Sequence, residues 1–264
     1  MEKLSDSLRS ETAMIGIMLS EIASPNMIRL LQQAGFQYTI VDNEHGSFDF
    51  SQLSALAGLA SGYGFPLVVR VPGISREHIT KVLDMGARGI LVPMVNTPEQ
   101  ARQVVAYSKY TPVGQRGIST TRAHTNYNPP PLAEYLRSAN QNTWTMVQLE
   151  TAEAIKNAEG IAGVEGVDAV LIGPNDLSAD LGTPGQVNSA GVRSAAEKVA
   201  AAGRKTGKPV GMITGNQELI RFCRQLGFTL FSVGSELDLL LRGGRERVEQ
   251  FRELCKHVDK EGKA

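Results

Sequence analysis

The stretch PLVVRVPGISREHITKVLDMGARGILVPMV, residues 66–95, holds two short apolar runs separated by a polar segment that ends at Gly86. The runs are Pro66–Val71 and Gly89–Val95, and both are rich in β-branched residues. Continuous apolar runs of this length are typical of parallel strands that are buried on both faces. The stretch therefore predicts a strand, a helix and a second strand parallel to the first.

The same unit recurs along the whole chain. Six further apolar runs occur, each followed by a helix-compatible stretch: Ala13–Leu19, Tyr38–Asp42, Thr143–Leu149, Ala169–Gly173, Pro209–Ile213 and Phe228–Val233. Eight strand–helix units in 264 residues predict an α/β fold, a closed (β/α)8 TIM barrel that forms a single domain over residues 1–264. An open, doubly wound sheet is the alternative, but no G-x-G-x-x-G follows the first run, which disfavours a dinucleotide-binding fold.

Local signals place the ends of several helices. Ser24-Pro25 and Thr97-Pro98 each combine an N-cap residue with proline at the first helical position. Helix ends are predicted at glycines that come shortly before the next strand, namely Gly35, Gly62, Gly86, Gly207 and Gly227. The segment 111–141 breaks the alternation, and its Thr, Asn and Pro content predicts a long irregular loop, either functional or a surface excursion.

Composition excludes several classes of protein. Lys plus Arg equals Asp plus Glu, so no net charge attracts the chain to nucleic acid or to an anionic membrane. The two cysteines, Cys223 and Cys255, have no zinc-site spacing and are expected to be reduced thiols. The N-terminal run Ala13–Leu19 is too short to span a bilayer and no cleavage site follows it, so the predicted location is cytoplasmic.

Charged and polar residues gather where the predicted strands end, which is where barrel enzymes carry their active sites. Four strand ends supply the main candidates: Asp42-Asn43-Glu44-His45-Gly46, Arg70, Gln148 with Glu150, and Gly173 with Asn175 and Asp176. Three others supply weaker ones: Ser20, Thr214 and Ser235.

Glu150 and Asp176 follow adjacent strands, so their carboxylates can converge. Two carboxylates without a nearby His or Cys favour a hard divalent ion such as Mg²⁺ or Mn²⁺. The structural alternative has Glu150 paired with an arginine and Asp176 capping a helix that begins at Leu177.

Arg70 and His45 are the candidates for charge stabilisation and proton transfer. A guanidinium can hold an oxyanion or a carboxylate with two donors, although Arg70 could instead form a structural ion pair in the barrel mouth. His45 can act as a general acid or base, and a carboxylate such as Asp42 or Asp84 could orient its ring. No lysine follows a predicted strand, which argues against a Schiff-base mechanism and for a metal.

Taken together, these stretches resemble the HpcH/HpaI aldolase family, the metal-dependent class II pyruvate aldolases of 2-oxo-3-deoxy acids. The resemblance extends from about Gly16 to Asp238. It rests on the order and spacing of VDNEHG (41–46), VVRVPG (68–73), LDMGARGILVPMV (83–95), GQRG (114–117), VQLET (147–151) and GVDAVLIGPNDLSADLG (166–182).

The resemblance implies a barrel of the phosphoenolpyruvate/pyruvate-binding type. It implies that Glu150 and Asp176 hold the divalent metal ion and that Arg70 steadies the pyruvyl oxygen. Gln148 would lie against the pyruvate carboxylate, together with backbone amides around Asn175 and Asp176. Gly173 would let such amides approach a ligand closely.

The resemblance also implies that His45, paired with Asp84 or Asp42, moves the proton of the aldehyde or alcohol. The expected reaction is cleavage of a 4-hydroxy-2-oxo acid to pyruvate and an aldehyde, or its reverse. The family commonly assembles as homo-oligomers, trimers or hexamers, that exchange their last helices.

Related activities remain open. Asn43 and the segment TTRAHTNYNPP (120–130), with its His124, depart from the pattern of a sugar-acid aldolase. An oxaloacetate decarboxylase, a macrophomate-synthase-like enzyme or an acyl-CoA lyase would use the same metal and Arg70. A non-catalytic barrel that binds a 2-oxo acid is the alternative from another class.

Overall fold

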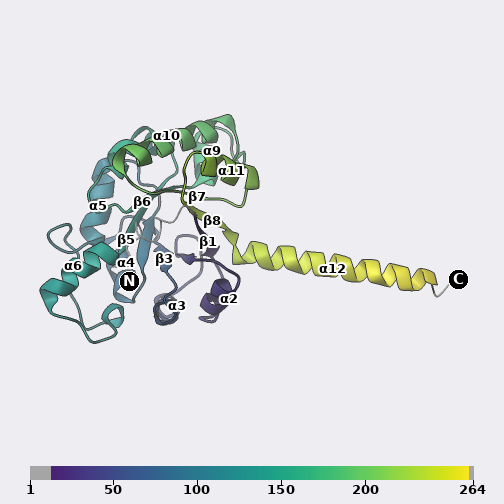
Figure 1. The fold of residues 1–264 in the computed structure, drawn as a ribbon, viewed down its shortest axis with the longest axis horizontal. Helices are drawn as coiled ribbons and strands as arrows, with labels where there is room; N and C mark the ends of the chain where they lie inside the picture. The colour runs from purple at the N-terminus through teal and green to yellow at the C-terminus, as the bar shows by residue number, and fades with distance from the viewer. Residues whose placement is uncertain (1–12, 262–264) are drawn as a thin grey trace.

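The eight predicted strands form a closed parallel barrel in the order β1 to β8 (Figure 1). The computed structural model describes residues 13–261; the two ends of the predicted domain, including most of the N-terminal segment considered for targeting, lie outside the described residues. The strands are β1 (Met14–Leu19), β2 (Tyr38–Asp42), β3 (Leu67–Arg70), β4 (Gly89–Val92), β5 (Trp144–Leu149), β6 (Ala169–Ile172), β7 (Val210–Ile213) and β8 (Leu230–Ser235). The predicted (β/α)8 barrel is therefore confirmed.

Helices surround the barrel and cover the outer face of its strands (Figure 1). They are α2 (Met27–Gln33), α3 (Phe50–Gly62), α4 (Arg76–Asp84), α5 (Pro98–Ser108), α6 (Leu132–Asn142), α7 (Ala152–Lys156), α8 (Ala158–Ala162), α9 (Pro174–Asp180), α10 (Ala190–Thr206), α11 (Gln217–Gln225) and α12 (Glu236–Glu261), with a short 3-10 helix at Ala123–Thr125. A large apolar cluster fills the space between strands and helices, and a smaller one fills the barrel interior.

This burial explains why the apolar runs could be recognised in the sequence. Every residue of β2 through β6 is buried, so these strands show no polar alternation. The parallel register pairs Asp42 with Arg70 at the ends of β2 and β3, and Leu149 with Ile172 at the ends of β5 and β6. The pairing thus brings the polar residues that follow these strands to one end of the barrel.

The capping predictions are confirmed at one helix and wrong at another. The Thr97 hydroxyl accepts a hydrogen bond from the Gln100 N–H (3.2 Å) in a capping box at the start of α5. Ser24 does not cap α2: the backbone N–H of Met27 donates to the Ser24 carbonyl, which forms a turn, and the helix begins only at Met27.

The predicted glycine stops are confirmed at Gly35, Gly86, Gly207 and Gly227, all of which have positive φ. At the end of α3 the prediction was two residues early. Gly62 is still helical, and Gly64, with φ of +64°, makes the left-handed turn.

The segment 111–141 is only partly irregular. Its second half forms α6, with Pro131 preceding the first helical residue. The prediction of one long loop was wrong because the helical segment LAEYLRSANQN was read together with the proline-rich stretch that precedes it.

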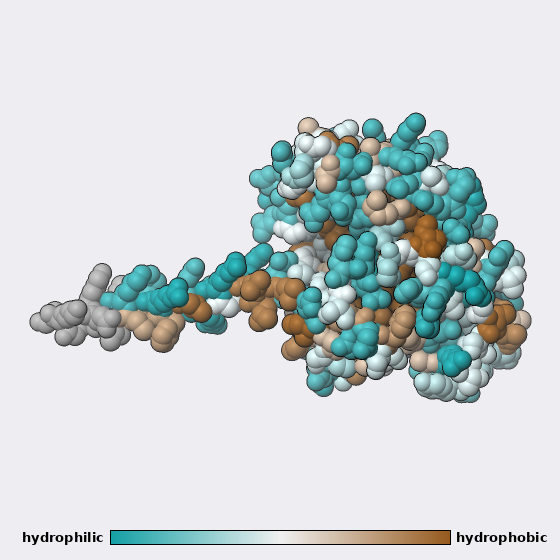
Figure 2. All heavy atoms as spheres, turned by 180° about the vertical axis from the view of Figure 1, so that it is seen from behind, coloured by the Kyte–Doolittle hydropathy of each residue, from teal (hydrophilic) through white to brown (hydrophobic). Residues whose placement is uncertain are grey.

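The last helix leaves the body of the molecule. α12 extends away from the barrel in Figure 1, and the rear view in Figure 2 shows apolar side chains along part of its surface. Among the described residues, no helix combines the length and the apolar character needed to cross a membrane.

Glu236, the first residue of α12, holds the turn that follows β1. Its buried carboxylate accepts hydrogen bonds of 2.7–3.2 Å from the consecutive backbone N–H groups of Ser20, Glu21 and Ile22. Hydrogen bonds to a charged acceptor are the stronger kind, and donors left without an acceptor in a buried site are costly.

We therefore expect Glu236→Gln to lower the free energy of unfolding by about 3 kcal/mol and the melting temperature by roughly 6–12 °C. Differential scanning calorimetry measures this loss. Glu246→Gln, an exposed change on the same helix, is the control. Equal melting temperatures for the two variants would show that the carboxylate is unimportant to the fold.

Candidate active site

Arg70 stands at the C-terminal end of β3 inside a cluster of carboxylates. Its Nε and Nη2 atoms donate to the two oxygens of Asp42 (2.9 and 2.7 Å), and its Nη1 lies 3.3 Å from Glu44. The Asp42 side chain also accepts the backbone N–H groups of Glu44 and His45, at 3.1 and 3.3 Å. These contacts fix the guanidinium plane, and three of its five N–H groups are used.

The electrostatics of this pair follow from its contacts. Burial tends to raise the pKa of Asp42, but the hydrogen bonds and charge of Arg70 outweigh it and lower that pKa. Burial likewise opposes the charge of Arg70, and the facing carboxylates raise its pKa. Arg70 is therefore a fixed cation at the C-terminal end of the strands, which we call the barrel mouth. It is held in an ion pair and can still donate two further hydrogen bonds.

Glu150 is a buried carboxylate that no described cationic side chain contacts. One oxygen accepts the backbone N–H of Met94 (3.0 Å), and the other accepts a short hydrogen bond from the Gln148 amide. Desolvation raises its pKa to about 7, helped by the charges of Asp176 and Glu44 and opposed by the Met94 N–H and Arg70. No ion pair joins Glu150 to an arginine among the described residues, so the structural alternative for this residue is not supported.

Asp176 lies in the first turn of α9, and its negative charge raises the pKa of both Glu150 and Glu44. It is not an N-cap, because Gly173 occupies that position and α9 begins at Pro174. A Cβ atom at Gly173 would overlap the side chains of Glu150 and Gln148, so only glycine permits this close approach. The side chain of Asp176 is exposed and can contact a ligand in the barrel mouth.

These residues fit a divalent cation. The C-terminal end of the barrel holds four carboxylates that surround the guanidinium of Arg70: Asp42, Glu44, Glu150 and Asp176. The negative charges of their neighbours raise the pKa of Glu44 and of Glu150. Burying an uncompensated carboxylate is unfavourable, so this excess of negative charge calls for a cation.

The atoms that could bind the ion are also oxygens, which hard cations prefer. The Oε1 atom of Gln148 is buried and has no hydrogen-bond partner within the described part of the chain. Across residues 13–261 no group of three or more His, Cys, Asp or Glu side chains could hold a metal by itself. Glu150 and Asp176 would thus supply two oxygen ligands and leave other positions to water and substrate, as is usual for Mg²⁺.

His45 is placed at the rim of this mouth. Its side chain is 69% exposed, and its Nε2 lies 3.7 Å from the Glu44 carboxylate. Asp42 contacts the backbone N–H of His45 and not its ring. The imidazole is therefore accessible to a substrate that reaches the barrel mouth.

Asp84 is not brought to His45 within one chain. It is the last residue of α4, and a helix that precedes a strand ends at the N-terminal face of the barrel, opposite the mouth. There it forms an ion pair with Arg116 (2.6 Å) and lies 3.9 Å from the Nδ1 atom of His124. Within one chain, Asp84 therefore does not contact the His45 ring, and a role of Asp84 beside His45 stays a prediction for the assembled protein.

Two residues of the site had not been predicted from the sequence. Met94 adopts a positive φ of 55°, and this backbone conformation directs its N–H to Glu150. Glu236 holds the β1 turn at the same end of the barrel. An apolar Met gives no sequence signal of such a role, whereas a glutamate directly after the eighth strand could have been noticed.

Comparison with known proteins identifies the family of this chain. The model of the HpcH/HpaI aldolase/citrate lyase family matches residues 17–243. A hydroxypyruvate/pyruvate aldolase of Pseudomonas aeruginosa is 37% identical over 93% of this chain and 91% of its own length. A 4-hydroxy-2-oxo-heptane-1,7-dioate aldolase of Salmonella dublin is 35% identical over 93% of each chain.

A solved structure shares the fold. The crystal structure of an HpcH/HpaI aldolase from Desulfitobacterium hafniense superposes with a TM-score of 0.89 at 31% identity, over 96% of this chain and 98% of that one. The family match and these relatives cover nearly the whole barrel, including the strand ends described above. The chain belongs to the HpcH/HpaI aldolase/citrate lyase family of carbon–carbon lyases.

Proposed function

We propose that this chain is a divalent-metal-dependent aldolase that cleaves a 4-hydroxy-2-oxo acid into pyruvate and an aldehyde, or forms it from them. The observation that carries the proposal is the buried carboxylate of Glu150, which has a raised pKa, makes no ion pair with a described side chain and shares the barrel mouth with Asp176. Mg²⁺ or Mn²⁺ would be held by Glu150 and Asp176. The names of the two aldolase relatives support pyruvate as one product.

Residues of this chain can bind the substrate and stabilise its developing charge beside the metal ion. When bound, the ion supplies a Lewis acid that draws electrons from the breaking carbon–carbon bond. The two remaining N–H groups of Arg70 would stabilise the negative charge that develops on the keto oxygen. The carboxylate of the substrate would be held by the Gln148 side chain and by the backbone N–H groups of Asn175 and Asp176. These two N–H groups lie in the first turn of α9 and have no partner inside that helix.

His45 would move the proton. In cleavage its imidazole would accept the proton of the 4-hydroxyl group and pass it to the enolate carbon, which completes the methyl group of pyruvate. In synthesis the same proton would move from the pyruvate methyl group to the aldehyde oxygen. Its exposure at the rim suits a group that meets the aldehyde end of the substrate, while Arg70 holds the pyruvyl end deeper in the barrel.

The test is a set of parallel incubations with Mn²⁺, pyruvate and a panel of small aldehydes, followed by measurement of pyruvate loss. Metal-dependent adducts that disappear with EDTA and return with added Mn²⁺ would support the proposal. A parallel incubation with oxaloacetate tests the nearest alternative. If oxaloacetate loses CO₂ and pyruvate remains unchanged with every aldehyde, the chain is a decarboxylase and the proposal fails.

Metal affinity should depend on pH through Glu150. Its pKa is raised to about 7, so below that pH a proton occupies the carboxylate and competes with the ion. We expect Mn²⁺ to bind roughly twentyfold more weakly at pH 5.5 than at pH 7.5, in titration calorimetry of the intact protein. An affinity that stays constant over this range would contradict the assignment of Glu150 as a ligand.

The same raised pKa predicts how the metal-free protein responds to pH. The contribution of Glu150 to stability is fully present below about pH 4.5 and is lost as the pH rises through about 7. Bound metal should therefore raise the melting temperature more at pH 7.5 than at pH 5.5.

We further propose that the single barrel domain assembles as a homo-oligomer, a trimer or hexamer, by exchanging α12 between subunits. The helix exposes a series of large apolar side chains: Leu239, Leu240, Leu241, Val248, Phe251 and Leu254. Such a surface is unfavourable in water and suits an interface. Light scattering on a sizing column should give the mass of three or six 28.4 kDa chains, and a monomer would contradict the exchange.

A further inference from the structure

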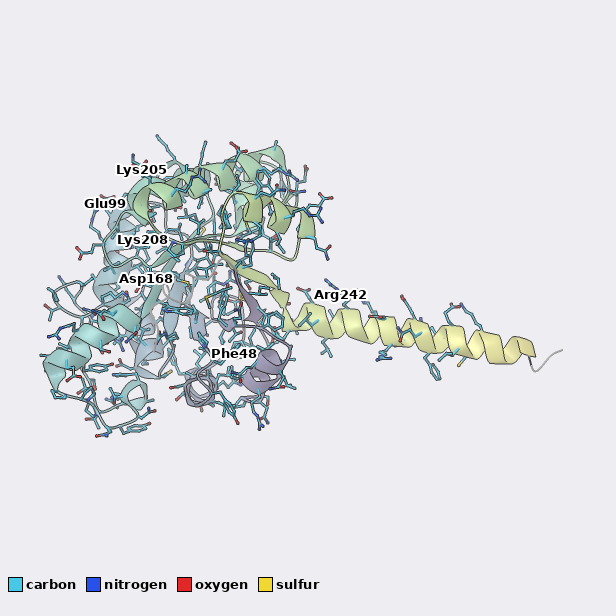
Figure 3. All side chains as sticks on the ribbon, in the orientation of Figure 1. Phe48, Glu99, Asp168, Lys205, Lys208 and Arg242 are labelled. Atoms are coloured by element: carbon cyan, nitrogen blue, oxygen red, sulfur yellow. The ribbon has the colours of Figure 1, made fainter. Side chains whose placement is uncertain are left out.

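Met94 has a backbone conformation that a methionine rarely adopts. Its φ is +55°, in the left-handed region, which is unfavourable for residues other than glycine, asparagine and aspartate. Met94 lies in the β4–α5 loop, residues 93–97, which runs from the end of β4 to α5, the helix that carries Glu99 in its first turn (Figure 3). Such a conformation persists only where the surrounding structure enforces it.

Three hydrogen bonds hold the rest of this loop against β5 and α7. The N–H of Val95 donates to the carbonyl of Gln148 at 3.2 Å. The side-chain oxygen of Asn96 accepts a hydrogen bond from the Thr151 hydroxyl at 2.6 Å, and its carbonyl accepts one from the Asn157 amide at 2.8 Å. None of these three bonds involves the methionine side chain, so they can enforce the left-handed conformation whatever side chain residue 94 carries.

The side chain and the backbone of Met94 have different surroundings. The side chain is 45% exposed, although Pro93 and Val95 on either side of it are buried. The backbone N–H donates to Oε2 of the buried Glu150 at 3.0 Å. The group of Met94 that touches the candidate metal site is therefore its N–H.

This N–H is one of two donors that hold the Glu150 carboxylate. The Met94 N–H occupies Oε2, and the Gln148 amide donates to Oε1. A carboxylate oxygen can accept at more than one lone pair, so both oxygens can still bind a cation. Groups that hydrogen-bond a metal ligand fix its orientation, and their loss typically weakens metal binding.

We propose that Met94 is a positioning residue for the divalent ion and that it acts through its backbone. The left-handed conformation directs the Met94 N–H to Glu150, and this hydrogen bond fixes the carboxylate in the orientation that binds the ion. The inference rests on the proposed metal site. It requires at position 94 a residue that tolerates the left-handed conformation, whatever the chemistry of its side chain.

Two replacements separate the backbone of residue 94 from its side chain. Met94→Pro removes the N–H and sets φ near about −65°. We expect it to weaken Mn²⁺ binding about tenfold to a hundredfold, measured by titration calorimetry of the intact protein. Met94→Asn makes the side chain polar but tolerates the left-handed conformation, so it should bind Mn²⁺ as the wild type does.

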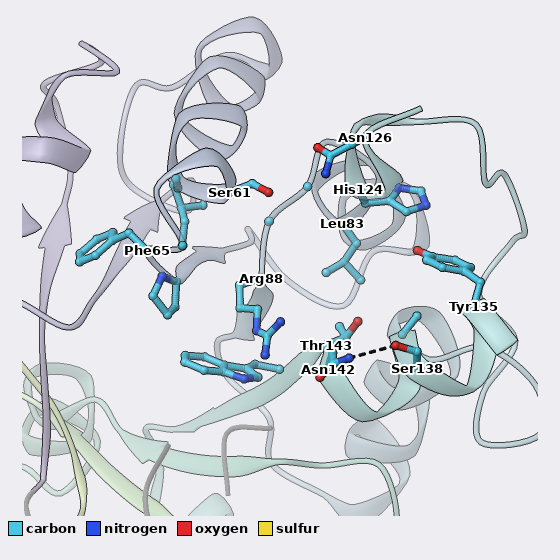
Figure 4. A pocket seen from close by; sticks show the side chains of 18 of the residues that line it. Ser61, Phe65, Leu83, Arg88, His124, Asn126, Tyr135, Ser138, Asn142 and Thr143 are labelled. Carbon is cyan, nitrogen blue, oxygen red and sulfur yellow. Dashed lines mark hydrogen bonds between the residues drawn. The ribbon is translucent and has the colours of Figure 1, made fainter. Parts of the chain in front are cut away.

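Tyr127→Pro is the matched control. Tyr127 also has a positive φ, of 58°, and its N–H donates to the Arg122 carbonyl at 3.0 Å, so proline removes the same two features there. The residue is exposed and follows Asn126, which lines a cavity at the opposite end of the barrel (Figure 4). We expect this variant to lose thermal stability, as Met94→Pro does, and to keep wild-type Mn²⁺ affinity.

Met94→Val keeps the test valid if Met94→Pro folds poorly. A β-branched side chain is strained at positive φ, so valine should weaken Mn²⁺ binding although it is apolar like methionine. A role of the methionine side chain predicts the reverse order, in which valine is tolerated and asparagine is not.

Unchanged Mn²⁺ affinity in both Met94→Pro and Met94→Val would overturn the inference, and so would a loss in Met94→Asn as large as theirs. Either result, with a wild-type protein that binds Mn²⁺, leaves the proposed metal site intact. A wild-type protein that binds no Mn²⁺ would refute the metal site and the inference with it. None of these measurements requires aldolase activity, so the substrate of the enzyme does not affect the result.

Discussion

Replacement of Glu150 by glutamine should lower kcat/KM for aldol cleavage by at least about a thousandfold, because a divalent ion contributes several kcal/mol to stabilisation of the transition state. Glutamine keeps nearly the same shape and can still accept the Met94 N–H, so the fold should persist. What is lost is the negative charge. Mn²⁺ affinity, measured by calorimetry, should fall by more than about a hundredfold.

The matched control for this variant is Glu153→Gln. Glu153 is exposed on α7, three residues further along the chain, and its replacement should change neither activity nor metal affinity. A Glu150→Gln protein that keeps wild-type Mn²⁺ affinity would remove Glu150 from the metal site. Activity that falls with affinity unchanged would assign it a different role in catalysis.

Replacement of Arg70 by lysine should lower kcat by about a hundredfold to a thousandfold, the usual cost of losing one donor to a developing oxyanion. Lysine keeps the positive charge beside Asp42 and Glu44, but it cannot present the planar fork that bonds both oxygens of Asp42 and leaves two N–H groups free. Metal affinity should change little, because Arg70 is not a ligand.

Steady-state kinetics with a saturating metal concentration separate these effects. Arg137→Lys, an exposed change on α6, is the control and should behave as the wild type. Arg70→Met is a less suitable variant, since it leaves the buried Asp42 unpaired and should destabilise the protein by about 3 kcal/mol. If Arg70→Lys retains full kcat and raises only KM, Arg70 binds the substrate without stabilising the transition state.

The barrel could be predicted from the sequence because its strands are buried on both faces. The run Tyr38–Asp42 coincides with β2, and Gly89–Val95 contains β4 followed by the loop that carries Met94. Boundaries shifted by one or two residues where a strand is flanked by a proline or glycine, as at Pro66 and Gly173. Helix starts were predicted less well, because Ser24 forms a turn where a cap was expected.

The site could be predicted in part. That Arg70, Glu150 and Asp176 share one end of the barrel follows from their positions after parallel strands. The same rule, applied to α4, would have placed Asp84 at the opposite end. The hydrogen bonds of Glu150 to Met94 and Gln148 depend on backbone angles and side-chain conformations, which no spacing of residues reveals.

The most direct test of the central claim is exchange of the pyruvate methyl protons in D₂O, followed by proton NMR with no aldehyde present. The account predicts that the methyl signal decays with enzyme and Mg²⁺, that EDTA stops the decay, and that Glu150→Gln does not support it while Glu153→Gln does. Exchange that continues without metal, or at an undiminished rate in Glu150→Gln, would contradict the assignment of this barrel mouth as a metal-dependent site for pyruvate deprotonation.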